Sequence, residues 1–162
     1  MNKKIFSNII EFFRIGLTCL GIYLGYYFYR SNPILGFQLS SFLTIISLAG
    51  LTGLEGLFLS QKASSENTGY LSGRAYQRQS ALSNLAIALA TIFVFLFNWG
   101  FFAIASLLIV LLIFLALSGL NHGYSAFYEK NTSIKNFLRP FITLILITAT
   151  IPIMINAYFF MK

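Results

Sequence analysis

Charged residues are scarce in this chain, and their scarcity excludes an ordinary water-soluble domain. Only 9% of the 162 residues are charged, whereas soluble domains carry about 25%. Hydrophobic residues make up 57% of the chain, and the mean hydropathy is +0.78. Because so few charges cannot cover a water-facing surface, lipid must cover much of the protein.

Aspartate is absent, and cysteine and histidine occur once each, as Cys19 and His122. A single cysteine excludes a disulfide within the chain and a thiolate metal site. The lack of aspartate excludes intramembrane proteolysis by an aspartate pair. The sequence also contains no HExxH, GxSxG, Walker or GxGxxG motif. We therefore predict no metal site and no cofactor.

Acidic residues are outnumbered by basic ones, 4 against 11, which gives a formal net charge of +7. In a soluble protein this excess would raise the question of nucleic-acid binding. Here the basic residues cluster between hydrophobic runs and form no basic stripe or recognition motif. The excess is typical of membrane topology, so we expect the bilayer and no nucleic acid as a partner.

Hydrophobic runs predict five transmembrane helices. Ser31-Asn32-Pro33 separates the first two runs, and Pro33 is placed to open the second helix. Residues 81–120 cannot form one helix, because it would be roughly 60 Å long, about twice the hydrocarbon thickness, so the chain must turn at Asn98-Trp99-Gly100. Pro140 is expected to open the last helix and Pro152 to kink it. The predicted fold class is all-α, a polytopic membrane helical bundle that forms a single domain over residues 1–162, with helices at about 9–29, 35–59, 74–97, 101–122 and 140–160.

Small residues predict which of these helices pack closely. Gly21 and Gly25 form a GxxxG pair in the first helix, a spacing that lets another helix approach. The helix at 35–59 is rich in Ser, Thr, Ala and Gly, which is typical of a central helix.

The distribution of basic residues predicts the orientation. Five spans place the two termini on opposite sides, and the side without the N-terminus carries only Arg30 and Lys162. The positive-inside rule then puts the N-terminus and both polar loops in the cytoplasm and the C-terminus in the periplasm. No mitochondrial-type leader is visible, so we expect a bacterial inner membrane. The basic residues of the N-terminal side are Lys3, Lys4, Arg14, Lys62, Arg74, Arg78, Lys130, Lys135 and Arg139.

Glu55 lies about one turn from the end of the predicted helix 35–59, and carboxylates inside membranes usually serve function. Two interpretations stay open: a structural ion pair with Arg74 or Arg78, and a role in ligand or proton binding. We expect the carboxylate to lie within hydrogen-bonding reach of Arg74, Gln77 or Arg78, because the helices that carry these residues are consecutive and antiparallel.

His122 and Asn84 are the other polar candidates in the spans. His122 ends the fourth predicted helix, where the helix dipole favours a charged imidazole. It serves either as a hydrogen-bonded interface residue or as a general base. Asn84 continues a polar-to-small face that starts with Arg74, Gln77 and Ala81, and its amide must find a partner inside the bundle.

Three segments of the sequence resemble the DUF6790 family of small bacterial membrane proteins of unknown function. They are Glu55 at a helix end, Gly73-Arg74-Ala75-Tyr76-Gln77-Arg78-Gln79-Ser80 before Asn84, and Asn121-His122-Gly123-Tyr124 before Lys130-Asn131. The resemblance covers roughly the last two-thirds of the chain. It implies a compact helical membrane protein, and it carries no activity. It singles out the aromatic-Gln segment, the helix-end histidine and the asparagine of the second polar loop. The combined candidate polar cluster is Glu55, Arg74, Tyr76, Gln77, Arg78, Gln79, Asn84, His122 and Asn131.

Three classes of function fit these residues. The first is transport or binding of a solute through the polar cluster on the cytoplasmic side, where Arg74 and Arg78 suit an anionic lipid headgroup or a small solute. The second is an accessory or assembly subunit that docks other membrane helices or forms a homo-oligomer. The third is a lipid-modifying enzyme that uses Glu55 and His122 in acid–base chemistry. No catalytic motif favours the enzyme.

Overall fold

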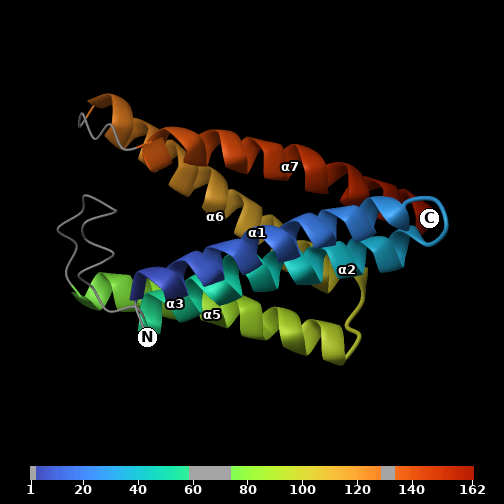
Figure 1. The fold of residues 1–162 in the computed structure, drawn as a ribbon. Coiled ribbons are helices and arrows are strands. Elements are labelled where there is room, and N and C mark those ends of the chain that lie inside the picture. The colour runs from blue at the N-terminus through green and yellow to red at the C-terminus, as the bar shows by residue number, and fades with distance from the viewer. Residues whose placement is uncertain (1–2, 59–73, 129–133) are drawn as a thin grey trace.

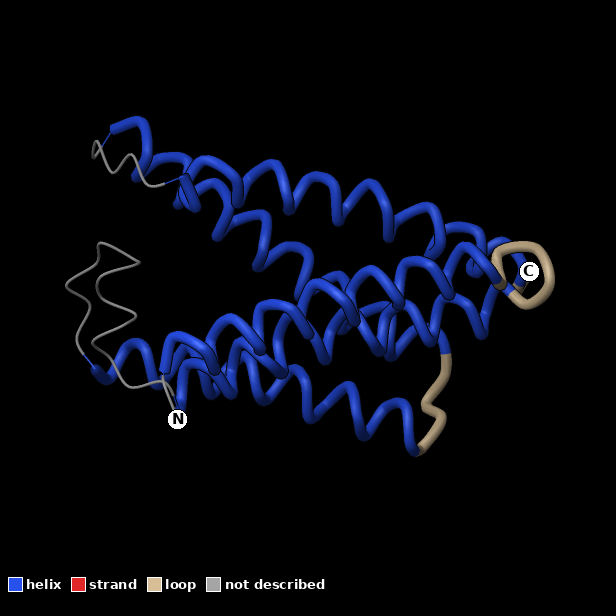
Figure 2. Tube along the Cα trace, in the orientation of Figure 1, coloured by secondary structure: helices blue, strands red, loops and turns tan. Residues whose placement is uncertain are grey.

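A computed structural model describes residues 3–58, 74–128 and 134–162, without the side chains of residues 3–4, 74–77 and 135–136. Almost all of this part of the chain is helical (Figures 1 and 2). The elements are α1 (Lys3–Tyr27), α2 (Pro33–Ile45), the π-helical segment η1 (Ile46–Gly50), α3 (Leu51–Phe58), α5 (Arg74–Leu96), α6 (Phe101–Tyr128) and α7 (Ile134–Phe160).

Five helical rods within the described residues are long and apolar enough to cross a membrane. One of them, Pro33–Phe58, is built from α2, η1 and α3 in series. The other four are Ile5–Tyr27, Arg78–Leu96, Phe101–Tyr128 and Phe137–Phe160. The predicted fold class, an all-α bundle with five such helices, is confirmed.

Successive rods run in opposite directions, so their ends gather at two ends of the bundle (Figure 1). One end collects the start of α1, the end of α3, the starts of α5 and α7, and the end of α6; we call it the N-terminal end. The C-terminus and the turns after α1 and α5 lie at the opposite end. Both turns form where the sequence predicts them. Asn32 caps α2 by accepting from the Leu35 N–H at 3.1 Å, and Asn98 and Gly100 adopt positive φ angles of 49° and 88°.

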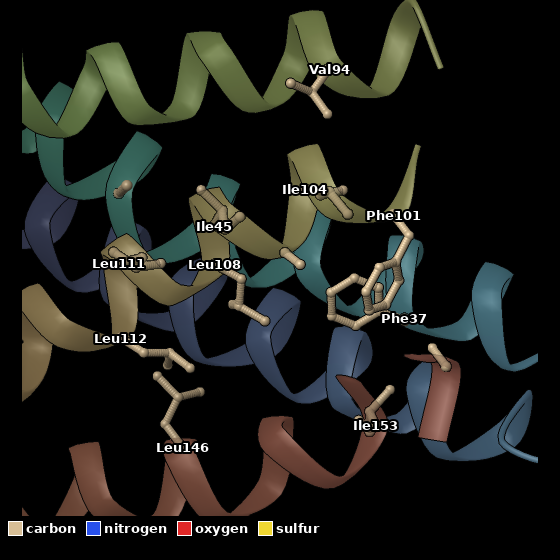
Figure 3. Packing of buried hydrophobic residues seen from close by; sticks show 13 residues of the cluster. Phe37, Ile45, Val94, Phe101, Ile104, Leu108, Leu111, Leu112, Leu146 and Ile153 are labelled. Carbon is tan, nitrogen blue, oxygen red and sulfur yellow. The ribbon is translucent and has the colours of Figure 1, made fainter. Parts of the chain in front are cut away.

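The apolar core lies where α2 meets α6 and α7 (Figure 3). Phe37 of α2 packs against Phe101 of α6 with 4.8 Å between the ring centroids. Toward the N-terminal end, the core continues through Ile45, Leu108 and Leu111, all less than 2% exposed. The predicted central position of the second helix is confirmed, since α2 contacts α1, α5, α6 and α7.

Helix α1 docks on α2 through small and polar residues. A Cβ on Gly21 would lie 3.0 Å from the carbonyl oxygen of Ser40, and one on Gly25 would lie 3.1 Å from the Ser40 Cβ. One turn further toward the N-terminal end, the hydroxyls of Thr18 and Ser47 share a hydrogen bond of 2.7 Å. The GxxxG pair therefore does what its spacing predicts and lets two helices approach closely.

Two local features differ from the sequence expectations. The second span is not a uniform α-helix, because η1 inserts a π turn in which the Leu51 N–H bonds to the Ile46 carbonyl. Pro140 does not open the last helix, since α7 begins at Ile134 and holds both Pro140 and Pro152. Pro140 sits in the second turn, where only one intrahelical bond is lost. Gly119 of α6 packs against it, and a Cβ there would lie 3.3 Å from the proline Cα.

Candidate functional site

Polar and charged side chains from four helices converge near the N-terminal end of the bundle. Each comes from a helix that is otherwise apolar, and together they link α1 to α3 and α6 to α7. We call this group the charged cluster, and its members are Ser7, Glu11, Arg14, Glu55, His122 and Arg139.

The π turn of η1 explains why Glu55 faces α1. An unbroken α-helix turns about 100° per residue, so a side chain eight residues after Ser47 would point about 80° away from it. A π turn accommodates one extra residue, which removes about 100° and brings Glu55 to within about 20° of the direction of Ser47. Since Ser47 bonds to Thr18 of α1, Glu55 points to the same helix. The irregular turn thus places the carboxylate.

The Glu55 carboxylate is held by two residues of α1. Ser7 Oγ donates to Glu55 Oε1 at 2.7 Å, and Arg14 Nη2 donates to Oε2 in an ion pair. The side chains of Arg14 and Glu55 are only 23% and 26% exposed, so water screens the pair weakly. The Arg14 Nε atom is buried and has no acceptor among the described residues. Arg14 therefore has one spare, desolvated donor beside its ion pair.

His122 and Arg139 form the second half of the cluster. Arg139 Nη1 contacts the His122 Nε2. A guanidinium has no acceptor, so Arg139 is the donor in this contact. His122 is buried at 8% exposure, whereas the Arg139 side chain is exposed. The expectation of a hydrogen-bonded interface role for His122 agrees with this contact between α6 and α7.

The two halves are joined by α1 and α7, which contact each other. Arg139 is within electrostatic range of Arg14 and Glu11 of α1. Arg139 therefore interacts with one cation and one anion of α1. Arg14 is paired with Glu55, and Arg139 contacts His122.

One expectation for Glu55 needs correction. Among the described side chains, the cation paired with Glu55 is Arg14 of α1, and not Arg78, which is exposed on α5. The reason is the π turn, which directs the carboxylate toward α1. Pairing of Glu55 with Arg74 or Gln77 stays a prediction, because those side chains lie outside the described residues.

The remaining predicted site residues are spread along α5 and beyond. Asn84 is buried at 7% exposure, and Gln79 is exposed. The side chain of Tyr76 and the whole of Asn131 lie outside the described part of the chain. The charged cluster therefore contains two of the predicted residues, Glu55 and His122.

Sequence reasoning missed four members of the charged cluster as site residues, although one signal was available for those of α1. They are Ser7, Glu11, Arg14 and Arg139. Helices α1 and α2 form an antiparallel hairpin. A step of one turn toward the N-terminus of α1 therefore lies opposite a step of one turn toward the C-terminus of the second span. Gly25 meets Ser40 and Thr18 meets Ser47. Extending that register places Glu55 opposite Ile10, about one turn from both Ser7 and Arg14. For Arg139 the sequence holds no such signal, since α7 is not adjacent to α1 in the chain.

The donor types in the described residues do not build a metal centre. No group of three or more His, Cys, Asp or Glu side chains is found there. The Cys19 side chain is exposed on α1, away from the charged cluster's contacts. The chemistry of the cluster is that of guanidinium, carboxylate, hydroxyl and imidazole groups.

Fold and cluster together define a class: small all-helical bundles with five rods that are each able to cross a membrane and with a charged cluster near one end. Residues 10–158 match a family of unknown function, DUF6790, and the chain belongs to this family. The match confirms the resemblance seen in the sequence and extends it into α1, the helix that carries Arg14. No curated protein and no solved structure matches the chain.

Proposed function

We propose that this protein binds a small anionic solute in the charged cluster, as the recognition step of a transport or solute-binding role in a membrane. The observation that carries the proposal is a buried guanidinium N–H without an acceptor, on an arginine that lies within electrostatic range of a second arginine. Arg14 Nε is desolvated without an acceptor, and Arg139 lies within Coulombic range of Arg14.

An anion between Arg14 and Arg139 resolves both features. A buried N–H without an acceptor costs about 1–3 kcal/mol, which a bound oxygen atom would recover. Two like charges repel each other, and an anion between them turns that repulsion into attraction. The planar guanidinium fork suits the two oxygens of a carboxylate or phosphate. Glu55 supports this arrangement by holding Arg14 in place.

We also propose that the protein lies in a bacterial inner membrane with its N-terminal end in the cytoplasm. The excess of basic residues on that side supports this orientation through the positive-inside rule. In this orientation the charged cluster meets solutes of the cytoplasm, and the turn at residues 97–100 faces the periplasm.

The proposal is tested on purified protein in detergent with inorganic phosphate, acetate and citrate as probes. Binding is read as a rise in the melting temperature at constant ionic strength and as heat in titration calorimetry. The expected result is saturable binding of at least one probe by the wild type and loss of binding in Arg139→Gln. Arg30→Gln is the matched control, because Arg30 is an exposed arginine at the opposite end of the bundle.

Two results would overturn the proposal. One is the absence of saturable binding for all three probes, and the other is equal binding by the wild type and Arg139→Gln. For a probe that binds, uptake of its radiolabelled form into proteoliposomes decides between transport and binding without transport.

A further inference from the structure

Two buried hydroxyls lie in the middle of the bundle, apart from the charged cluster. Ser41 and Thr44 of α2 are 1% and 0% exposed, and Thr44 lies near the middle of the second rod, Pro33–Phe58. The Ser41 Oγ and Thr44 Oγ1 atoms have no hydrogen-bond partner among the described residues. By contrast, the buried hydroxyls of Thr91 and Thr150 donate to the carbonyl one turn back. Ser41 and Thr44 therefore keep hydrogen-bonding capacity that the protein does not use.

The geometry of α2 allows both hydroxyls to contact one small ligand. Residues three apart in a helix are neighbours on its surface, with Cβ atoms about 5–6 Å apart. A backbone oxygen lies close by. The point that a Cβ on Gly21 would occupy is 3.4 Å from Thr44 Oγ1 and 3.0 Å from the Ser40 carbonyl oxygen. Because Gly21 has no side chain, these two oxygens border the same small space between α1 and α2.

Helix α7 brings a third hydroxyl to this level. Ile153 packs on Gly25 of α1, since a Cβ there would lie 2.5 Å from the Ile153 Cδ1. One turn nearer the N-terminal end, α1 carries Gly21 and α7 carries Thr150. Leu146 and Ile153, one turn to either side of Thr150, both point into the core (Figure 3), and Thr150 is buried. Its hydroxyl donates to the Leu146 carbonyl at 2.8 Å, which leaves its lone pairs for a cation.

We infer that the protein binds a sodium ion in the middle of the bundle. The ligands are the hydroxyls of Ser41, Thr44 and Thr150 and the carbonyl of Ser40, which we call the hydroxyl site. Oxygen atoms are the ligands that hard cations take in proteins. Neutral oxygens can replace the hydration shell of a monovalent cation, whereas a site for Ca²⁺ includes carboxylates. The hydroxyl site has no carboxylate, and Glu55 lies about three turns farther along the rod. Na⁺ fits better than the larger K⁺, because α1 and α2 approach closely at Gly21.

The position of the hydroxyl site in the fold also supports a bound ion. The π-helical segment η1 begins two residues after Thr44 and interrupts the second rod near its middle. Such π turns are frequent at functional sites. In membrane transporters, coupling ions bind near the midplane at helices that are interrupted in this way.

The test is thermal unfolding of the full-length protein in detergent, with NaCl exchanged for choline chloride at constant ionic strength. The melting temperature of the wild type should rise saturably with Na⁺, because an ion that binds only the folded state stabilises it. Thr44→Val should weaken the apparent Na⁺ affinity about tenfold, the loss expected for one contact between a polar group and a charge. Ser41→Ala and Thr150→Val should weaken it similarly. Equilibrium binding of radiolabelled sodium to the same proteins checks that the melting temperature reports binding.

Two matched controls accompany these variants. Thr148→Val makes the same change at an exposed threonine of α7 that bonds only within its own helix. Ser106→Ala removes an exposed hydroxyl of α6 that donates to the carbonyl one turn back. Both should respond to Na⁺ as the wild type does. Valine has nearly the shape of threonine, so Thr44→Val is expected to fold, and Ser41→Ala and Thr150→Val remain informative if it does not.

The inference is overturned if Na⁺ and choline give the same melting temperature, because buried water would then explain the unused hydroxyls. It is also overturned if Ser41→Ala, Thr44→Val and Thr150→Val all keep the Na⁺ affinity of the wild type, or if K⁺ stabilises the protein as well as Na⁺ does. The probe is the cation alone, so the outcome does not depend on anion binding at the charged cluster.

Discussion

The hydroxyls of Thr18 in α1 and Ser47 in η1 lie 2.7 Å apart and join the first two rods of the bundle. Thr18 Oγ1 also lies 2.8 Å from the Arg14 carbonyl oxygen, and Ser47 Oγ lies 3.0 Å from the Thr44 carbonyl oxygen. Since each hydroxyl has one hydrogen, one of the two donates to the other and the second donates to a carbonyl of its own helix. Thr18 lies one turn along α1 from Arg14. The Thr18–Ser47 hydrogen bond and the Arg14–Glu55 ion pair both join α1 to the second rod.

Replacing Thr18 with Val should weaken the bundle modestly. Hydrogen bonds between membrane helices average about 0.6 kcal/mol and reach about 1.7 kcal/mol. A double-mutant cycle of Thr18→Val and Ser47→Ala, followed by unfolding in mixed micelles, should give a coupling energy in that range. Thr148→Val is the control, since Thr148 is exposed and bonds only within α7. A coupling energy of zero would contradict an interhelical bond.

Removing the Glu55 carboxylate should cost more. Breaking a buried ion pair costs about 3–5 kcal/mol and breaking an exposed one under about 1 kcal/mol. At about one quarter exposure, Glu55→Gln should lower the free energy of unfolding by about 1–3 kcal/mol. The double variant Arg14→Leu, Glu55→Leu should recover part of the loss, because neither charge is then left alone. If Glu55→Gln is as stable as the wild type, the pair contributes nothing to folding.

Deleting one residue from the π turn should leave Arg14 paired with Glu55, because the extra residue is the one that the π turn accommodates. Without Ala49, Glu55 would lie seven residues after Ser47 in a regular helix and would still point within about 20° of the direction of Ser47. In this background, adding Arg14→Gln should therefore lower stability as much as it does in the full-length chain. The measurement is the melting temperature of the four proteins in one detergent. If Arg14→Gln has no effect in the deletion background, the register argument for η1 is wrong.

Replacing Gly53 or Gly16 with alanine should change the free energy of unfolding in opposite directions. A Cβ on Gly53 would meet the Ala81 carbonyl oxygen at 2.9 Å, so α3 and α5 would have to move apart, at a cost of about 1–3 kcal/mol. Gly16 has nothing within 4 Å of a new Cβ, and alanine there should gain up to about 1 kcal/mol from helix propensity. Unfolding free energies of the two variants check both signs. A stable Gly53→Ala would contradict close packing of α3 on α5.

The proposed orientation predicts which single cysteines a membrane-impermeant maleimide reaches in intact cells. On a Cys19→Ser background, Ser31→Cys in the turn between α1 and α2 should be labelled from outside. Ser65→Cys, between α3 and α5, should be labelled only after the cells are permeabilised. The reverse pattern would invert the topology while leaving the fold unchanged.

The rods and turns were predictable because they follow from local chemistry. Long apolar runs fix the spans, Asn32-Pro33 starts a helix, and Asn98 and Gly100 supply the positive φ angles of a tight turn. The partner of Glu55 was not predictable in the same way. Apolar periodicity assumes a regular helix, and the π turn at Ile46–Gly50 leaves no clear mark in composition.

The contact between His122 and Arg139 shows a second limit of sequence reasoning. The position of His122 at a helix end was evident, but its partner depends on how α7 lies against α6. In that packing, Gly119 of α6 contacts Pro140 of α7. Pro140 lies inside α7, although the sequence predicted that the helix begins at this proline. An earlier start of α7 gives Arg139 a helical position facing His122.

The closest helix packing joins neighbours in the chain: α1 with α2, α3 with α5, and α6 with α7. Each pair is a hairpin of two rods that run in opposite directions (Figure 2). Contacts between neighbours in the chain close short loops, which favours rapid folding. During synthesis from the N-terminus, each hairpin would therefore form before the next one has been made. The Arg14–Glu55 pair would form early, and the charged cluster would be complete only when α7, the last rod, docks on α1.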